Sequence, residues 1–230
     1  MEKAENRIIY ADVLPLTDDK AFGDELSEVS KYRKDKVNRL IGEDKKRQSL
    51  LCGILLKECL HRIGIDEKTA EYSSGLNGKP SLKEYPQVKF GVSHSGRYAV
   101  CVLSDNEIGC DVQEVKPTDF KIAEKFFSDD ERKLLGRVSE DEKTDVFFSI
   151  WARKESFVKA CGENLVSFFN RFSVCDEKGF LSAVRYDGKE WFIREYDALY
   201  GYKLAVCTLS ERFDGEPTEY LFSTSINNKN

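Results

Sequence analysis

Residues able to carry out acid–base and phosphate chemistry gather near the end of one predicted helix, over residues 145–161. Helical spacing puts Lys154 in the middle of the apolar face and Glu155 on its border, one turn before Lys159. In one interpretation Lys154 extends its ammonium group to water, and Glu155 and Lys159 form a surface ion pair. In the other, this helix is one wall of a reactive cleft. The choice depends on what the rest of the chain brings to the helix.

A second set of polar side chains lies on a strand predicted over residues 107–114. Asp111 and Gln113 are two residues apart and share one face of that strand, while Cys110 and Val112 point to the other. Two oxygen-bearing side chains on one face form half of a hard-cation site, and magnesium accepts such ligands while keeping positions for water or phosphate. The competing interpretation is a polar strand face turned to solvent.

Two further segments offer cations for an anionic ligand. The turn-rich segment 72–80 contains Gly75 and Gly78, which permit close backbone approach, and Lys79 lies beside them. A helix predicted over 31–41 carries outward basic residues, among them Arg33 and Lys36. Taken alone, such a loop is ordinary and such a helix face is usually solvated.

The bulk composition narrows the class of protein. The chain has 230 residues, 40% hydrophobic and 33% charged, as expected for a soluble globular protein. A formal net charge of −5 argues against general nucleic-acid binding. Seven scattered cysteines without a Cys-x-x-Cys pair favour buried free thiols, and only two histidines exclude a histidine-rich metal site. No signal segment or membrane-length apolar run occurs, so we expect a cytoplasmic protein that does not enter a membrane.

The predicted elements mix helices and strands in an α+β fold. Asp145 is expected to be the N-cap of the helix over 145–161, and Gly162 its left-handed C-cap. Ser128 and Glu131 have capping-box spacing for a short helix that runs to about residue 135. The remaining helices are expected over 18–29, 31–41, 44–63 and 118–127, and strands over 8–14, 88–93, 98–104, 107–114, 168–175, 191–196 and 201–209, before a frayed tail from 224 to 230.

A short internal repeat indicates how these elements are organised. Residues 99–104 read Ala-Val-Cys-Val-Leu-Ser, and 205–210 read Ala-Val-Cys-Thr-Leu-Ser, 106 positions later. The spacing suits a duplicated α+β unit, with residues 1–110 as the N-terminal half and 111–230 as the C-terminal half. Asp111 would then lie at the junction, where ligands commonly bind.

Three blocks of the sequence resemble, in order and spacing, the signature blocks of phosphopantetheinyl transferases. The last block matches the W-x-x-K-E-S-x-x-K pattern of the larger monomeric subgroup, which activates nonribosomal peptide and polyketide synthases. The segment Gly78-Lys79-Pro80 and residues 45–51 are also similar to that family. The blocks are 90–95 (Phe-Gly-Val-Ser-His-Ser), 108–113 (Ile-Gly-Cys-Asp-Val-Gln) and 151–160 (Trp-Ala-Arg-Lys-Glu-Ser-Phe-Val-Lys-Ala).

The resemblance implies a pseudo-two-fold α+β fold with its active site in the cleft between two similar halves. It implies transfer of the 4′-phosphopantetheine arm of coenzyme A to a serine of an apo acyl or peptidyl carrier protein, with release of adenosine 3′,5′-bisphosphate. Magnesium is the implied cofactor. The implied partners are coenzyme A and the carrier, with no nucleic acid or membrane, and a monomer is the simpler expectation.

The resemblance also assigns roles to residues. Asp111, Gln113 and Glu155 are the expected metal ligands, although many members have Glu where this chain has Gln113. Glu155, directly or through a water, is the expected base for the carrier serine, Lys159 stabilises the leaving group, and Lys154 is expected to face the cleft as a further cation. The expected coenzyme A contacts are Arg33, Lys36, Arg47, Lys79, Ser93, His94 and Lys159.

Three alternatives stay open. Gln48 is one residue from Arg47 and competes with it for a family arginine position; Arg47 is preferred because a guanidinium group grips phosphate. A non-catalytic coenzyme A or carrier-binding module of the same fold is the competing function. For the carrier, the segment 118–135 with Phe126 and Phe127 is the expected docking surface, unless those aromatic rings belong to the core.

Overall fold

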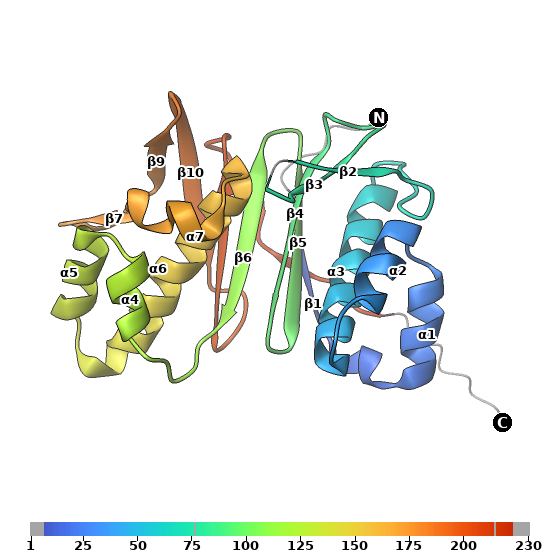
Figure 1. The fold of residues 1–230 in the computed structure, drawn as a ribbon, viewed down its shortest axis with the longest axis horizontal. Helices are drawn as coiled ribbons and strands as arrows, with labels where there is room; N and C mark the ends of the chain where they lie inside the picture. The colour runs from blue at the N-terminus through green and yellow to red at the C-terminus, as the bar shows by residue number, and fades with distance from the viewer. Residues whose placement is uncertain (1–6, 76, 214, 223–230) are drawn as a thin grey trace.

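Two layers of helices enclose the strands of this protein, as the ribbon in Figure 1 shows. The structure is a computed structural model that describes residues 7–75, 77–213 and 215–222. Helices α1 to α3 cover one side of the strands, and α4 to α6 cover the other. The mixed architecture agrees with the α+β class expected from the sequence.

The first part of the chain forms one helical layer and most of one sheet. Its elements are β1 (Arg7–Asp12), the 3-10 helix η1 (Leu14–Thr17), α1 (Asp19–Ser27), α2 (Lys31–Asn38), α3 (Glu43–His61), β2 (Tyr72–Ser74), β3 (Pro80–Leu82), β4 (Lys89–Ser95) and β5 (Tyr98–Ser104).

The second part forms the other sheet and the other helical layer. Its elements are β6 (Ile108–Glu114), α4 (Lys121–Phe126), α5 (Asp129–Arg137), α6 (Glu140–Cys161), α7 (Leu165–Phe168), the 3-10 helix η2 (Phe169–Arg171), β7 (Cys175–Asp176), β8 (Gly179–Phe180), β9 (Ala183–Tyr186), β10 (Lys189–Tyr196), β11 (Tyr202–Thr208) and β12 (Thr218–Glu219).

The two main sheets share one topology. Their strand orders are β12-β1-β5-β4 and β6-β11-β10-β9. In each sheet a first strand is followed by a long helix and then by two antiparallel strands, the later of which pairs with the first strand. Strands β5 and β11 occupy equivalent places, and the sequence repeat at 99–104 and 205–210 falls on them.

The shared topology supports our proposal of a duplicated unit. The change of sheet falls between β5 and β6, because all of β6 belongs to the second sheet. The chain then returns at its far end, where β12 pairs with β1 in parallel. The division into residues 1–110 and 111–230 remains a proposal.

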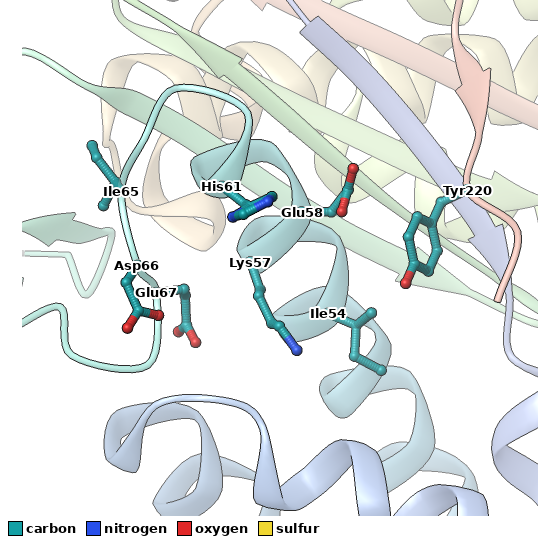
Figure 2. Close-up of a pocket in the computed structure, with 8 residues that line it drawn as sticks. All are labelled: Ile54, Lys57, Glu58, His61, Ile65, Asp66, Glu67 and Tyr220. Atoms are coloured by element: carbon teal, nitrogen blue, oxygen red, sulfur yellow. The ribbon is translucent and has the colours of Figure 1, made fainter. Parts of the chain in front are cut away.

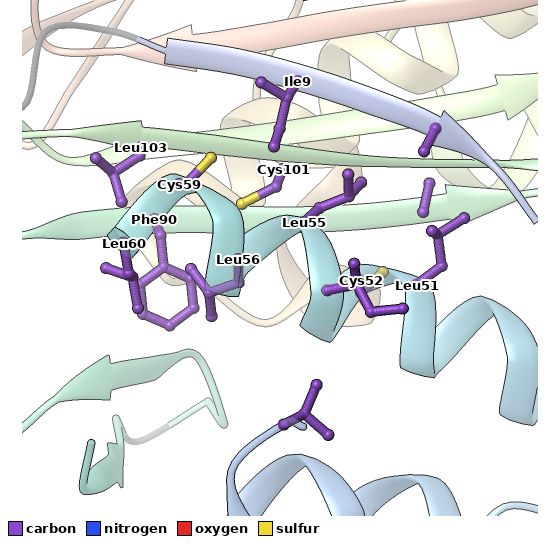
Figure 3. Close-up of a cluster of buried hydrophobic side chains, with 14 of the residues drawn as sticks. Ile9, Leu51, Cys52, Leu55, Leu56, Cys59, Leu60, Phe90, Cys101 and Leu103 are labelled. Carbon is purple, nitrogen blue, oxygen red and sulfur yellow. The ribbon is translucent and has the colours of Figure 1, made fainter. Parts of the chain in front are cut away.

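Three buried clusters hold the layers together. Leu51, Leu55 and Cys59 of α3 pack on the first sheet, as Figure 3 shows. Helix α6 packs through Phe157 on Trp191 of the second sheet and through Phe147 on Phe127 after α4, and a third cluster lies between the sheets. Removing such side chains from water supplies the main stabilisation of each layer, about 1.5–3 kcal/mol for each large residue.

Helix α6 begins earlier than the sequence predicts. Its N-cap is Ser139, which forms a capping box with Glu142, so the prediction of Asp145 as N-cap was wrong. Asp145 lies inside the helix and pairs with Lys203 at 2.6 Å. The predicted C-cap is confirmed, because Gly162 adopts a left-handed conformation with φ of 73°.

A strand predicted over 168–175 was also wrong. Residues 165–171 form α7 and η2, and only Cys175 and Asp176 lie in a strand. The aromatic residues that suggested a strand instead turn their rings into the core, where Phe168 and Phe172 stack on Phe157. Tertiary packing overrides strand propensity here. The tail predicted from 224 lies outside the described residues.

The state of the cysteines agrees with the prediction from the sequence. All seven are free thiols, and six of them are buried. Across the described ranges, no helix combines the length and apolar character needed to cross a membrane.

Candidate active site

Asp111 lies at the centre of the candidate site, on the face of β6 that the sequence assigned to it. Only 1% of its surface is exposed. Its Oδ1 atom accepts hydrogen bonds from Ser93 Oγ at 2.7 Å and from Lys159 Nζ at 2.5 Å. Its Oδ2 atom accepts one from Gln113 Nε2 at 2.7 Å. Because these donors come from β4, α6 and β6, Asp111 lies where the first sheet meets the second sheet and its helix.

Glu155 faces the same point from helix α6. Its Oε2 atom lies 3.1 Å from Lys159 Nζ, and its Oε1 atom accepts a hydrogen bond from Trp151 Nε1 at 2.7 Å. The side chains of Glu155 and Lys159 are 15% and 33% exposed, so their pair lies in a partly enclosed cleft and not on an open surface. The ammonium group of Lys159 therefore stands between two carboxylates, those of Glu155 and Asp111.

Two glycines allow this close approach. A Cβ atom at Gly109 would lie 2.4 Å from the backbone nitrogen of Ala160 and 2.5 Å from the carbonyl oxygen of Ser156, so only glycine lets α6 lie directly on β6. A Cβ atom at Gly91 on β4 would lie 3.2 Å from Cα of Gly109. Strands β4 and β6 and the end of α6 are thereby brought together at the site.

Burial and neighbouring charges shift the pKa values of the central groups. Burial raises the pKa of the Asp111 carboxyl; Lys159 opposes this effect, and Glu155 adds to it. Burial alone would lower the pKa of the Lys159 ammonium, but Asp111 and Glu155 outweigh burial and hold that pKa above its usual range. Lys159 is therefore charged at neutral pH and is strongly held by its two carboxylates.

A buried guanidinium group with one unsatisfied nitrogen atom lies near this centre. Arg33 on α2 is only 2% exposed, and its Nη1 donates to the carbonyl oxygen of Ser49 at 3.2 Å. Its Nε atom has no hydrogen-bond partner among the described residues. A Cβ atom at Gly53 would lie 2.6 Å from Cγ of Arg33, so this glycine of α3 provides the slot that the side chain occupies. An unsatisfied buried cation favours binding of an anion.

Nearby positive charge also lowers the pKa values of two more groups. Partial burial lowers the pKa of Lys36, and the charge of Arg33 lowers it further. The pKa of His94 is lowered because protein atoms displace part of its water, and then because Lys159, Lys36 and Arg33 are positive. A cavity of about 230 Å³ opens beside them, lined by Lys36, Lys159, Lys79, Phe90 and Val158 among others. Of the predicted residues, Lys36, Lys79 and Lys159 line this cavity, while Ser93 accepts a hydrogen bond from Lys159 at 3.2 Å.

The alternatives at Arg47 and Gln48 differ in their contacts. Arg47 lies 3.4 Å from Asp44 at the start of α3. Gln48 donates from Nε2 to the carbonyl oxygen of Gly96 at 2.7 Å, next to the segment that carries His94. Gln48 is therefore attached to the turn beside the cleft, and the assignment of Arg47 to coenzyme A remains a proposal.

Lys79 lines the cavity but uses its donors within the protein. Its Nζ atom donates to Glu107 at 3.1 Å and to the carbonyl oxygens of Ile108 at 3.1 Å and Ala160 at 2.9 Å. Asn77, in the same loop, donates to the carbonyl oxygen of Gly162 at 2.7 Å. The loop thus binds the C-terminal end of α6, where a cation is favourable. A phosphate contact of Lys79 remains a proposal and requires exchange of one of these bonds.

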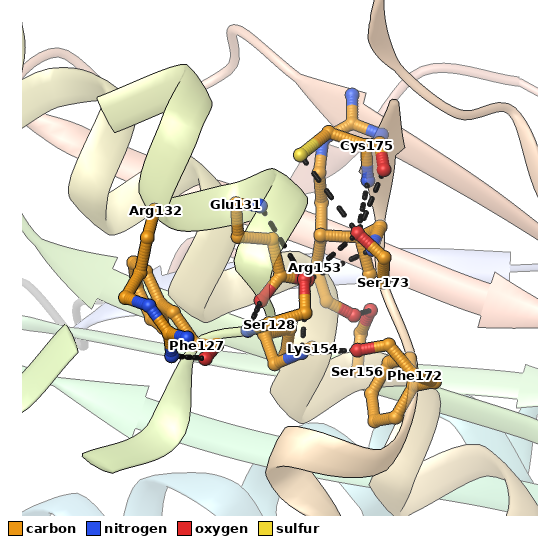
Figure 4. A network of polar contacts seen from close by, with 11 residues as sticks. Phe127, Ser128, Glu131, Arg132, Arg153, Lys154, Ser156, Phe172, Ser173 and Cys175 are labelled. Carbon is orange, nitrogen blue, oxygen red and sulfur yellow. Dashed lines mark hydrogen bonds and ion pairs between the residues drawn. The ribbon is translucent and has the colours of Figure 1, made fainter. Parts of the chain in front are cut away.

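Lys154 does not face the cleft, contrary to the expectation from the sequence. Figure 4 shows it within a polar network that includes Glu131 and Phe172. Its Nζ atom donates to Glu131 Oε1 and to the carbonyl oxygen of Phe172, both at 2.8 Å, and the side chains of Lys154 and Glu131 are fully buried. The ring of Phe172 lies 4.1 Å from the ammonium group. Lys154 occurs on an apolar face because a buried carboxylate from α5, which the sequence alone does not locate, compensates its charge.

The aromatic residues proposed for docking a carrier are also in the core. Phe127 is fully buried and stacks on Phe147, and Phe126 packs edge-on against Trp151 and Phe169. The expectation that Phe126 and Phe127 form an exposed patch was wrong, because the turn between α4 and α5 directs both rings inward.

Comparison with known proteins shows the family of this chain. A 4′-phosphopantetheinyl transferase of Bacillus subtilis is 34% identical over 191 residues, covering 82% of this chain and 85% of that protein. The chain belongs to the 4′-phosphopantetheinyl transferase superfamily. The superfamily profile itself matches residues 107–207 of the transferase.

Further relatives give the same result. 4′-phosphopantetheinyl transferase Sfp of Bacillus subtilis (strain 168) is 32% identical over 196 residues, covering 84% of the transferase and 88% of its own chain. Psf-1 of Bacillus pumilus is 31% identical over 166 residues, or 70% and 71% of the two chains. The crystal structure of Thermotoga maritima holo-[acyl-carrier-protein] synthase covers 46% of this chain and 64% of its own, with 21% identity and a TM-score of 0.30, so it does not enter the argument.

The centre of the transferase fits a magnesium ion. Within the described ranges, no three or more His, Cys, Asp and Glu side chains form a group able to hold a metal. Two carboxylates nevertheless converge on one positive charge, the ammonium group of Lys159, which shows that a cation is stabilised there. Asp111 and Glu155 would hold the ion, and Gln113 can add its amide oxygen by rotating its side chain.

A second cavity lies away from this centre. It has a volume of about 190 Å³ and opens on the outer face of α3, as Figure 2 shows. None of the predicted site residues lines it. The carboxylate of Glu67 at its edge is satisfied by Ser30 and Tyr72, so this buried charge does not point to a ligand there.

Several residues that build the site were missed in the sequence. Gly109 and Gly53 make room for α6 and for Arg33, and Trp151 orients Glu155. One signal was available for Gly109, because it precedes Asp111 by two residues and shares its strand face. No local signal identified Gly53, since its partner lies on another helix.

Proposed function

We propose that this transferase moves the 4′-phosphopantetheine arm of coenzyme A to a serine hydroxyl of an apo carrier protein, with magnesium. One observation carries the proposal. The buried Asp111 and the partly exposed Glu155 share the Lys159 ammonium at the edge of a cleft whose other side carries the ammonium group of Lys36. A polyanionic donor and a hard cation match these two halves of the cleft.

The reaction needs few parts. The serine oxygen attacks the β-phosphorus of the coenzyme A diphosphate, the bond from that phosphorus to the bridging oxygen breaks, and adenosine 3′,5′-bisphosphate leaves with the bonding electrons. Catalysis of this kind depends on positioning and on stabilising charge at oxygen atoms. A magnesium ion, when bound, would neutralise charge on the diphosphate.

The residues of the chain divide the remaining tasks. Arg33, Lys36 and His94 are the proposed contacts for the phosphates of the adenosine part, since the charges of Arg33 and Lys36 both act on His94. Lys159 can donate a hydrogen bond to the bridging oxygen and stabilise the departing phosphate. Glu155, held by the Trp151 indole, can take the serine proton directly or through a water, because its side chain is open to the cleft.

A transfer assay tests the proposal. The transferase is incubated with coenzyme A, magnesium and several apo carrier proteins, and the carriers are examined by mass spectrometry for the added arm. Transfer to any carrier supports the proposal. If coenzyme A binds but no carrier is modified, the chain is instead a binding module. We do not favour that alternative, because the relatives that match most of the chain are named as transferases. The carrier, a monomeric state and a cytoplasmic location remain predictions.

A further inference from the structure

Lys159 occupies the place that a metal ion would need. Its ammonium group lies 2.5 Å from Asp111 Oδ1 and 3.1 Å from Glu155 Oε2. An ion that ligates both carboxylates would contact the same oxygen atoms at about 2.1 Å. Two positive charges cannot share those oxygens at such a separation without strong repulsion.

Asp111 also has little free capacity for a new ligand. It accepts three hydrogen bonds, from Ser93 and Lys159 at Oδ1 and from Gln113 at Oδ2. A carboxylate offers about four acceptor positions in total. About one position is then left for a metal ion, and among the three donors Lys159 is the one whose charge opposes the metal directly.

The side chain of Lys159 can move into the neighbouring cavity. A third of its side-chain surface is exposed, and it lines the cavity beside Lys36. A diphosphate in that cleft offers oxygen atoms to the ammonium group when it leaves Asp111. Without such an anion, displaced Lys159 would lie beside Lys36 and near the buried Arg33, where further positive charge is unfavourable.

We propose that Lys159 blocks the metal position of the free transferase, and that a bound diphosphate must draw it off Asp111 before the metal enters. This inference rests on the proposed function and adds an order of binding to it, with coenzyme A first and the metal second. By linkage, the diphosphate and the metal strengthen each other's binding to the protein. Gln113 makes the lysine an effective competitor, because the amide brings no charge to assist the metal.

Calorimetry with Mn²⁺ as the probe tests the inference on the free protein. We expect Lys159→Met, without coenzyme A, to bind Mn²⁺ at least about tenfold more tightly than wild type does, because the competing charge is gone. Lys36→Met is the matched control, since Lys36 lies in the same cleft but does not contact Asp111, and its gain in Mn²⁺ affinity should be several-fold smaller than that of Lys159→Met. No gain in Lys159→Met, or an equal gain in Lys36→Met, would overturn the inference.

Wild-type protein gives a second test that does not depend on the folding of a variant. Coenzyme A should bind in the presence of EDTA, whereas Mn²⁺ without coenzyme A should bind at least about tenfold more weakly than to the coenzyme A complex. Equal Mn²⁺ affinity with and without coenzyme A would refute the order. Failure of the proposed function would look different, because no carrier would be modified while these metal affinities still followed the expected pattern.

Discussion

Lys154→Met separates a structural lysine from a catalytic one. The substitution removes one charge of a pair whose two side chains are fully buried. Glu131 would keep only the backbone donors of Ser128 and Val174, and the carbonyl oxygen of Phe172 would lose its partner. Leaving one charge of a buried pair without its partner costs about 3–5 kcal/mol. For a chain of this size each kcal/mol shifts the melting temperature by about 2–4 °C, so a decrease of about 6–20 °C is expected.

Thermal scanning and urea unfolding measure this loss. The double variant Lys154→Met/Glu131→Gln removes both charges and should recover at least half of it, because the penalty arises from the unpaired carboxylate. Lys133→Met removes an exposed lysine of α5 that pairs with Asp130, and we expect it to change stability by less than about 1 kcal/mol.

Coenzyme A affinity decides the role of Lys154. Below its melting temperature, Lys154→Met should bind coenzyme A as wild type does. In the wild-type protein the ammonium group of Lys154 pairs with Glu131 and does not face the cleft. Our reasoning is refuted if Lys154→Met has the melting temperature of wild type but loses coenzyme A binding or transfer. Lys154 would then act in the cleft.

Three further predictions concern the cleft. Glu155→Ala should keep coenzyme A affinity within a few-fold but lower transfer by about 10²–10⁴-fold, measured as the rate of carrier modification. His94 has a lowered pKa in the free protein, and nearby phosphate should raise it, so coenzyme A binding near pH 6.5 should take up protons at His94; calorimetry in buffers of different ionisation enthalpy measures the difference between wild type and His94→Gln. Gly109→Ala should lower both stability and transfer, because its Cβ would meet the backbone of α6 at 2.4 Å, and thermal scanning with the transfer assay tests this.

The controls for these predictions lie in the same chain. Gly136→Ala on α5 adds a Cβ with nothing within 4 Å, and we expect unchanged or slightly higher stability. If Gly109→Ala behaves like Gly136→Ala, α6 does not depend on the close approach at β6. Equal proton uptake in wild type and His94→Gln would mean that another group titrates, and undiminished transfer by Glu155→Ala would remove Glu155 from both the base and the metal-ligand roles.

The sequence by itself determined the strand face of Asp111 and the helix that carries Glu155 and Lys159. A period of two residues on a strand and of about 3.6 on a helix depends only on local backbone geometry, so each side chain could be given a face before its neighbours were known. The α+β class followed from the same patterns, and the three sequence blocks indicated the family.

Tertiary structure alone decided which partner each of those faces meets. Lys154 and Lys159 are five residues apart on one helix, but the first is paired with Glu131 in the core and the second with Asp111 in the cleft. Their difference is set by segments that fold against α6 from elsewhere in the chain. Gly109 acts in the same way, because only the packing of α6 on β6 requires it to lack a side chain. Charges and close contacts act between neighbours in space, and the order of residues along the chain does not specify those neighbours.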